Sequence, residues 1–183
     1  GMDVGVSGGE YGFFSGTLHF ILNQIRGLPL GVVERDAREV CLEMKELKVE
    51  GALNLAKPHW QYALNLLGQS ENPLVLSGEA MNETDYLSDP MVIGSSANRI
   101  ILTTQKLELA RLFGSYEFAE QHATLLTKQF KDYAVKFDFG VYDAKFNLAL
   151  LWYHCTRESR GGRQRRRYLS KARREVNFMK RTR

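Results

Sequence analysis

The sequence predicts an all-α protein in which antiparallel helical hairpins stack as a solenoid of about seven helices. Apolar residues recur every three or four positions in successive segments, and this is the period of an α-helix. No segment shows the strict apolar–polar alternation that is typical of a half-buried strand. Glycines that can end helices fall at positions 27, 68, 114 and 161, so the gaps are 41, 46 and 47 residues. Regular spacing in this range indicates an array of helix pairs.

The stretch 100–133 is the clearest predicted hairpin. Gly114 ends its first helix, because glycine adopts the left-handed conformation after a helix without strain. Ser115 is expected to cap the second helix, whose apolar stripe is Ala119, Ala123, Leu126, Phe130, Tyr133 and Phe137. The pattern Gly114-x-Tyr116-x-x-Ala119 resembles the middle of a tetratricopeptide repeat, in which small residues let two helices approach closely.

Three helices and a loop are predicted before this hairpin. Apolar stripes indicate helices over 11–25, over 33–47 and up to Leu67, and Pro58 either kinks the third or occupies its first turn. The polar segment 69–89 is long for a loop within a domain, so we expect it to be functional, partly helical or mobile. Asp89 and Pro90 then read as the N-cap and first residue of a helix that runs to Phe113.

Two further helices are predicted after the hairpin. Asp138 is expected to cap the first, and Gly161-Gly162 to end it, with inward side chains at Tyr142, Phe146, Ala149, Trp152 and Tyr153. The second is strongly basic, with Leu169, Ala172, Val176 and Met179 on its inner face. The expected organisation is a disordered or tag-derived start at 1–9, a helical array over 10–158 and a basic C-terminal helix over 159–183.

Charge is distributed unevenly along the chain. The formal net charge is +4. Residues 157–183 hold twelve Lys and Arg against two acids, a net of +10, so the remaining 156 residues have a net charge of −6. No apolar run approaches the 18 residues of a membrane span. Cys41 and Cys155 are isolated within apolar helical faces, which favours buried thiols and a cytoplasmic location, with a nuclear one possible from the Arg-rich tail.

Several phrases together resemble the tetratricopeptide-like helical region of large multidomain signalling ATPases. They are Gly27-Leu-Pro-Leu-Gly31, the stretch 60–68, the stretch 73–83, the stretch 112–119 and 146–151, in that order. Such proteins combine an Orc1-like AAA ATPase with kinase-like, GAF, histidine-kinase or nucleotide-cyclase domains. The resemblance, over roughly residues 10–172, implies a relay segment without catalytic residues of its own. The chain departs from it at the Arg-rich end.

No residue type or spacing indicates a catalytic, cofactor or metal site. The four histidines are scattered, and His154 and Cys155 are adjacent on a helix, so their side chains point about 100° apart. The acids of segment 69–89 lack a cation-binding spacing, and a solvated loop is the expected reading. Partner binding on a concave face could use aromatic residues, although core packing is the default for each, and the candidates are Tyr62, Tyr86, Phe118 and Tyr142.

The strongest local charge signal is a basic patch consisting of Arg163, Arg165, Arg166, Arg167, Lys171, Arg173 and Arg174. Such a run could bind nucleic acid, direct nuclear import, pack on an acidic neighbouring domain or be a solvated face. The sequence therefore predicts a non-catalytic helical scaffold or relay segment that binds proteins or neighbouring domains. The alternative is a nucleic-acid-associated helical protein that uses this patch.

Overall fold

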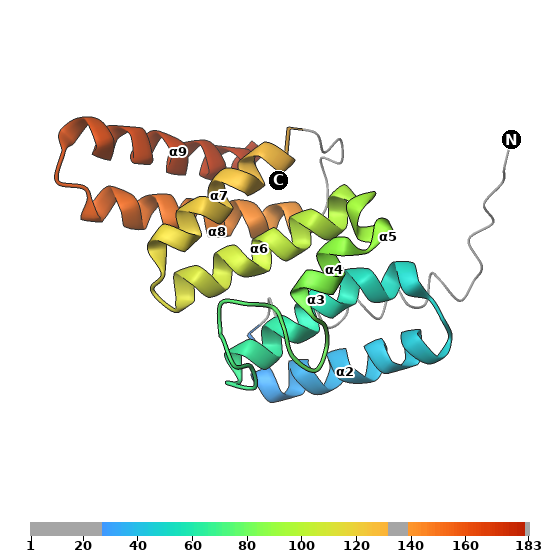
Figure 1. Ribbon diagram of the computed structural model, residues 1–183. Helices are drawn as coiled ribbons and strands as arrows, with labels where there is room; N and C mark the ends of the chain where they lie inside the picture. Colours follow the sequence, from blue (N-terminus) through green and yellow to red (C-terminus); the bar gives the residue numbers. More distant parts are fainter. Residues whose placement is uncertain (1–26, 132–138, 182–183) are drawn as a thin grey trace, which may run out of the picture. The chain divides into compact units, whose positions relative to one another are not determined.

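All regular structure in the part of the chain described by the computed structural model, residues 27–131 and 139–181, is helical (Figure 1). The all-α prediction is therefore confirmed for these residues. They contain eight helices: α2 (Leu30–Glu46), α3 (Glu50–Leu66), α4 (Glu83–Ser88), α5 (Pro90–Ile93), α6 (Ser96–Leu112), α7 (Tyr116–Gln129), α8 (Phe139–Glu158) and α9 (Gly162–Arg181). None of the described helices is long and apolar enough to cross a membrane. The chain divides into two compact units, one up to Asn98 and one from Arg99 onward.

Helices α2 and α3 form the hairpin at the centre of the first unit. Their buried apolar side chains form one cluster that includes Ala37, Met44, Leu53, Trp60 and Leu64, as the predicted stripes require. Helix α2 ends within one residue of the predicted position, although no glycine marks its end. Instead Lys48 takes the left-handed conformation, with φ of 56°, and the N–H of Val49 donates to the Met44 carbonyl at 2.9 Å. This is the helix-ending motif that glycine usually provides.

Pro58 lies inside α3 rather than in its first turn, so that alternative is wrong. A proline there has no N–H to give to the carbonyl of Asn54, four residues earlier. That carbonyl accepts instead from the hydroxyl of Tyr86, at 2.7 Å. Asn54 and Tyr86 are both buried. The hydrogen bond that the proline removes is thus replaced by a side chain from the segment that follows α3.

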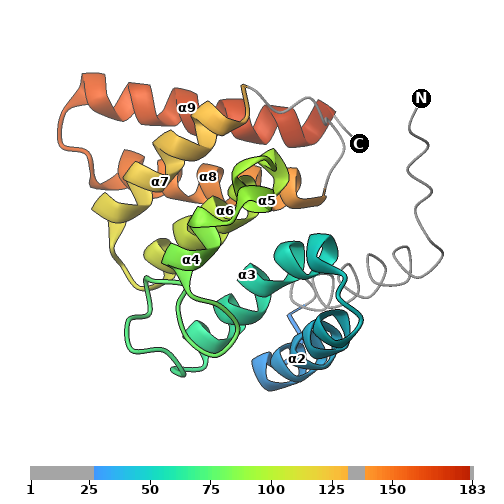
Figure 2. The same ribbon diagram turned by 45° about the vertical axis from the view of Figure 1, so that its right-hand side comes forward.

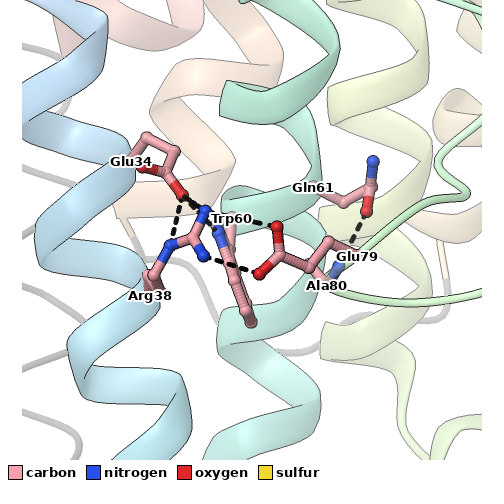
Figure 3. A network of polar contacts seen from close by, with 6 residues as sticks. All are labelled: Glu34, Arg38, Trp60, Gln61, Glu79 and Ala80. Carbon is pink, nitrogen blue, oxygen red and sulfur yellow. Dashed lines mark hydrogen bonds and ion pairs between the residues drawn. The ribbon is translucent and has the colours of Figure 1, made fainter. Parts of the chain in front are cut away.

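The predicted long loop is partly helical, and its extended part is fixed to α2 and α3 (Figure 3). Gln61, fully buried in α3, accepts from the N–H of Ala80 at 3.1 Å and donates to Asn65 at 2.9 Å. Glu79 forms an ion pair with Arg38 of α2 at 2.6 Å. A Cβ on Gly78 would lie 2.7 Å from Gln61 Nε2, so glycine lets the loop approach α3 this closely.

The predicted helix 90–113 is interrupted. Asp89 caps its start as expected, since its side chain accepts from the N–H of Met91 at 2.8 Å. However, α5 ends at Ile93 and α6 begins at Ser96. The reason is local: Gly94 weakens the helix, and Ser95 Oγ accepts from the N–H of Asn98 at 3.2 Å as a new N-cap.

In the second unit, Gly114 closes α6 with φ of 73°, and the N–H of Ser115 donates to the Ala110 carbonyl at 2.8 Å. The predicted helix end is confirmed. Two details differ. Ser115 precedes α7 but makes no side-chain cap. A Cβ on Gly114 would meet nothing within 4 Å, so this glycine is needed for its backbone conformation and not for close helix approach. Ala119, by contrast, is fully buried.

Helices α8 and α9 run antiparallel and lie side by side in both views (Figures 1 and 2). Helix α8 ends at Glu158, three residues before the predicted glycine pair, and Gly162 begins α9. Trp152 and Ala149 face inward as predicted, whereas Phe146 and Tyr153 are 53% and 43% exposed. The apolar residues of α8 cover more of its circumference than one helix face, so some of them must face solvent. The predicted helix 11–25, the start 1–9, Tyr133, Phe137 and the Asp138 cap lie outside the described residues.

Candidate anion-binding surface on helix α9

Helix α9 is strongly basic, and a buried carboxylate anchors it. Glu175 is 1% exposed and is the only acid within the helix. It forms ion pairs with Lys145 of α8 at 2.8 Å and with Arg174 at 2.7 Å. Because a buried charge is tolerated only when it is paired and hydrogen-bonded, these contacts fix which side of α9 faces α8. Ala172, fully buried, lies on the same side of the helix.

The opposite side of α9 carries a row of basic residues that we name the outer face. It surrounds a surface groove of about 890 Å³ lined by Arg166, Leu169, Ser170, Arg173, Arg174, Asn177, Phe178 and Arg181. Within the described residues, Arg166 and Arg173 form no ion pair with an acidic side chain. Their charges are therefore available to an anionic partner.

A second side of α9 faces α7 across a cleft of about 970 Å³, which we name the α7–α9 cleft. Its α7 wall contains Glu120 and Thr124, and its α9 wall contains Arg163, Gln164, Arg167, Tyr168 and Lys171. The hydroxyl of Tyr168 donates across the cleft to Glu120 at 2.9 Å. The other oxygen of Glu120 lies 3.5 Å from the Cys155 thiol.

Lys171 is the innermost cation of the cleft. Its Nζ lies 3.8 Å from the ring centre of Trp152, which is stacked on Tyr168 with ring centres 5.8 Å apart. Burial, followed by the positive charge of Arg167, lowers the pKa of Lys171, while Glu120 acts in the opposite direction. Because burial and Arg167 disfavour the charged form of Lys171, an anion bound beside Lys171 and Arg167 would be attracted by both cations.

A separate polar cluster joins α6 and α8 within the second unit. Arg111 donates to Asn147 at 3.1 Å, and Asn147 donates to the carboxylate of Asp143 at 3.1 Å. Burial, then the negative charge of Glu108, raises the pKa of Asp143 to about 7, and Arg111 opposes the shift. This cluster couples the packing of two helices to the protonation of one carboxyl group.

The four aromatic candidates for partner binding do not line one groove. Tyr62 and Tyr86 are 3% and 5% exposed, so both belong to the interior of the first unit and neither is open to a partner. The default of core packing holds for these two. Phe118 and Tyr142, in the second unit, are half-buried, and Phe118 packs edge-on against His122 with ring centres 4.4 Å apart.

The residues dismissed as catalytic or metal ligands have structural contacts. His154 stacks on Tyr116, with ring centres 3.5 Å apart, and does not share a contact with the Cys155 thiol. Burial raises the pKa of both Cys41 and Cys155 to about 12, so neither thiol is activated. No three His, Cys, Asp or Glu side chains gather in a metal-binding arrangement within residues 27–131 and 139–181.

Sequence reasoning missed Glu175, Lys145 and Glu120, which set the orientation of α9 and the chemistry of the cleft. The sequence did contain one indication that Glu175 is buried. It is the one acid of a basic helix, and it lies on the same apolar side as Ala172 and Met179. Nothing in the local sequence identified Glu120, whose partner Tyr168 is 48 residues away. The sequence matches no protein-family model, and comparisons with curated proteins and with solved structures give no match.

Proposed function

We propose that this chain is a non-catalytic helical scaffold that binds an acidic protein surface or neighbouring domain through the outer face of α9. The observation that carries the proposal is the pair Arg166 and Arg173 on that face, which form no ion pair with an acidic side chain in the described part of the chain, whereas Arg174 is paired with Glu175. Leu169 lies on the same face, and Phe178 borders it while its ring packs against Tyr142 and Lys145 of α8. A mixed surface of this kind suits a protein interface, in which apolar anchors are surrounded by charges that select the partner.

A tetratricopeptide-like solenoid and a relay role in a large signalling ATPase remain part of this proposal. Gly114 ends α6 with a positive φ, Ala119 of α7 is fully buried, and Tyr116 stacks on His154 of α8, and these features support the repeat-like interpretation. In such an array one helix face is free to hold a partner segment.

The test is site-specific photo-crosslinking in the cells that make the protein. A photoreactive residue replaces Ser170 or Asn177 on the outer face, and a matched control carries it at the exposed Leu125. We expect acidic protein adducts at the first two positions only, and we expect Arg166→Gln with Arg173→Gln to reduce them strongly. Equal labelling at all three positions would remove the basis of the proposal.

The second candidate is nucleic-acid binding by the same face. It is favoured by arginines that recur along one side of a 20-residue helix, a length of about 30 Å, with Asn177 and Ser170 between them. Affinity for a fluorescent oligonucleotide would then fall steeply with salt, with a slope in log K against log salt of about −0.9 for a DNA duplex, or about −0.7 for a single strand, for each phosphate that the arginines neutralise. An affinity that survives the Arg166→Gln, Arg173→Gln change and does not respond to salt would exclude this candidate.

A further inference from the structure

The α7–α9 cleft is a second cationic site, separate from the outer face. Arg163, Arg167 and Lys171 follow one another at intervals of four residues on the α9 side that faces α7. At this spacing successive side chains lie one above another on the helix. Three cations therefore line one wall of the cleft, and a volume of about 970 Å³ is at the upper end of the range of small-molecule sites.

The first turn of α9 adds to this positive wall. Gly161 and Arg163 line the cleft, so the helix begins at its mouth. The first backbone N–H groups of a helix have no carbonyl partner within it, and they carry the positive end of the helix dipole. Backbone N–H groups beside arginines are a common arrangement for binding a phosphate group.

The one acid in the cleft does not neutralise these cations through an ion pair. Glu120 lies on the opposite wall, where it accepts from Tyr168 at 2.9 Å and contacts the Cys155 thiol at 3.5 Å. No ion pair within the described residues joins it to Arg163, Arg167 or Lys171. The lowered pKa of Lys171 agrees with this geometry, since its positive charge is destabilised by burial and by Arg167.

We infer that the α7–α9 cleft binds the phosphate group of a small phosphorylated ligand, held by Arg163, Arg167 and Lys171. Gln164 lines the same space, and the amide N–H that it does not give to Tyr168 can donate a hydrogen bond to the ligand's oxygens. Glu120 opposes the bound charge and so limits the affinity. The proposal does not depend on the outer face, which lies on another side of α9.

The experiment is a titration of the full chain with inorganic phosphate and, separately, with glycerol 3-phosphate. Trp152 fluorescence is the readout, measured in a Trp60→Phe background, because Trp152 lies under Lys171. We expect saturable binding of at least one of the two. Equal affinities would identify the phosphate group alone as the ligand, and tighter binding of the ester would show that the cleft also holds the organic part. Absence of saturation by both would overturn the inference.

Three variants, each checked for an unchanged melting profile, locate the site. Arg163→Gln with Arg167→Gln should weaken binding about tenfold or more, the loss expected for charge-assisted hydrogen bonds. The matched control, Arg166→Gln with Arg173→Gln, removes the same charge from the outer face and should weaken binding by no more than about threefold. Equal losses would mean that overall charge, and not the cleft, binds the anion.

Glu120→Gln should strengthen binding, because it removes a like charge while its side-chain oxygen still accepts from Tyr168. Weaker binding by this variant would contradict the assignment of Glu120 as the opposing charge. A failed anion titration together with positive crosslinking at Ser170 would refute the cleft and leave the proposed function standing.

Discussion

The replacement of a helix hydrogen bond by the Tyr86 hydroxyl yields a direct test of how α3 tolerates its internal proline. Tyr86→Phe removes only the hydroxyl that donates to the Asn54 carbonyl at 2.7 Å. Asn54 is 1% exposed, and Pro58 has no N–H to offer. The carbonyl would then be buried without a donor, at a cost of about 1–3 kcal/mol in the free energy of unfolding.

A double-mutant cycle makes the prediction specific. In a Pro58→Ala background, residue 58 regains an N–H that can donate to the Asn54 carbonyl. Tyr86→Phe should then cost less than about 1 kcal/mol, because the carbonyl keeps a partner. The expected coupling energy between positions 58 and 86 is therefore about 1–2 kcal/mol, within the range measured for residues that share one hydrogen-bond network.

The assay is urea unfolding followed by Trp60 fluorescence in a Trp152→Phe background, since the two compact units need not unfold together. Trp60 lies in α3, next to the proline. Tyr153→Phe, at an exposed position in the other unit, is the control and should change stability by less than about 0.5 kcal/mol. If Tyr86→Phe costs the same in both backgrounds, the hydroxyl does not substitute for the missing N–H.

Three further predictions concern the backbone and one buried acid. Lys48→Gly should stabilise the first unit by roughly 0.5–1 kcal/mol in urea unfolding, because a left-handed residue with a Cβ is strained; destabilisation would contradict this. Gly114→Val should destabilise the second unit by about 2 kcal/mol or more, through its positive φ and not through a clash, and a midpoint equal to wild type would refute the assignment. The pKa of Asp143 is raised to about 7, so its contribution to stability should be fully present below its unfolded pKa of about 4 and be lost as the pH rises through 7. The charges that face this carboxyl group are Glu108 and Arg111. Asp143→Asn should remove most of the pH dependence of stability between pH 4 and 7, measured in melts of the second unit. If the slope of stability against pH is unchanged, another group causes the pH dependence.

The long helices of the described chain follow from local sequence signals. Gly68 and Gly114 end helices with positive φ, Asp89 caps one, and the stripe through Leu53, Trp60 and Leu64 is buried. These features depend on residues within one or two turns of each other, so periodicity and capping rules suffice. The stripe also placed the end of α2 correctly to within one residue, but these rules did not predict that Lys48 would end it, because a lysine rarely takes the left-handed conformation.

Features that depend on residues far apart in sequence could not be predicted. Local rules left two places for Pro58 because they could not include Tyr86, whose hydroxyl satisfies a carbonyl 32 residues earlier. Segment 69–89 looked like a loop because its polar residues suggested solvent. In the folded unit its backbone instead satisfies Gln61 and Asn65, two buried polar side chains of α3. Gln61 and Asn65, polar residues of α3, are therefore buried because segment 69–89 covers them. The same segment carries Tyr86 and buries it against α3.

The direction in which each basic residue of α9 points also depends on residues far apart in sequence. Composition alone identifies α9 as basic, but it cannot separate the three sides of the helix. The buried Glu175, paired with Lys145 and Arg174, fixes which side faces α8. Once that side is fixed, helical geometry directs Arg166 and Arg173 outward and Arg167 and Lys171 toward α7. One acid among many cations thus determines that the helix presents two distinct basic sides, which is why variants of equal charge on each side are the informative experiment.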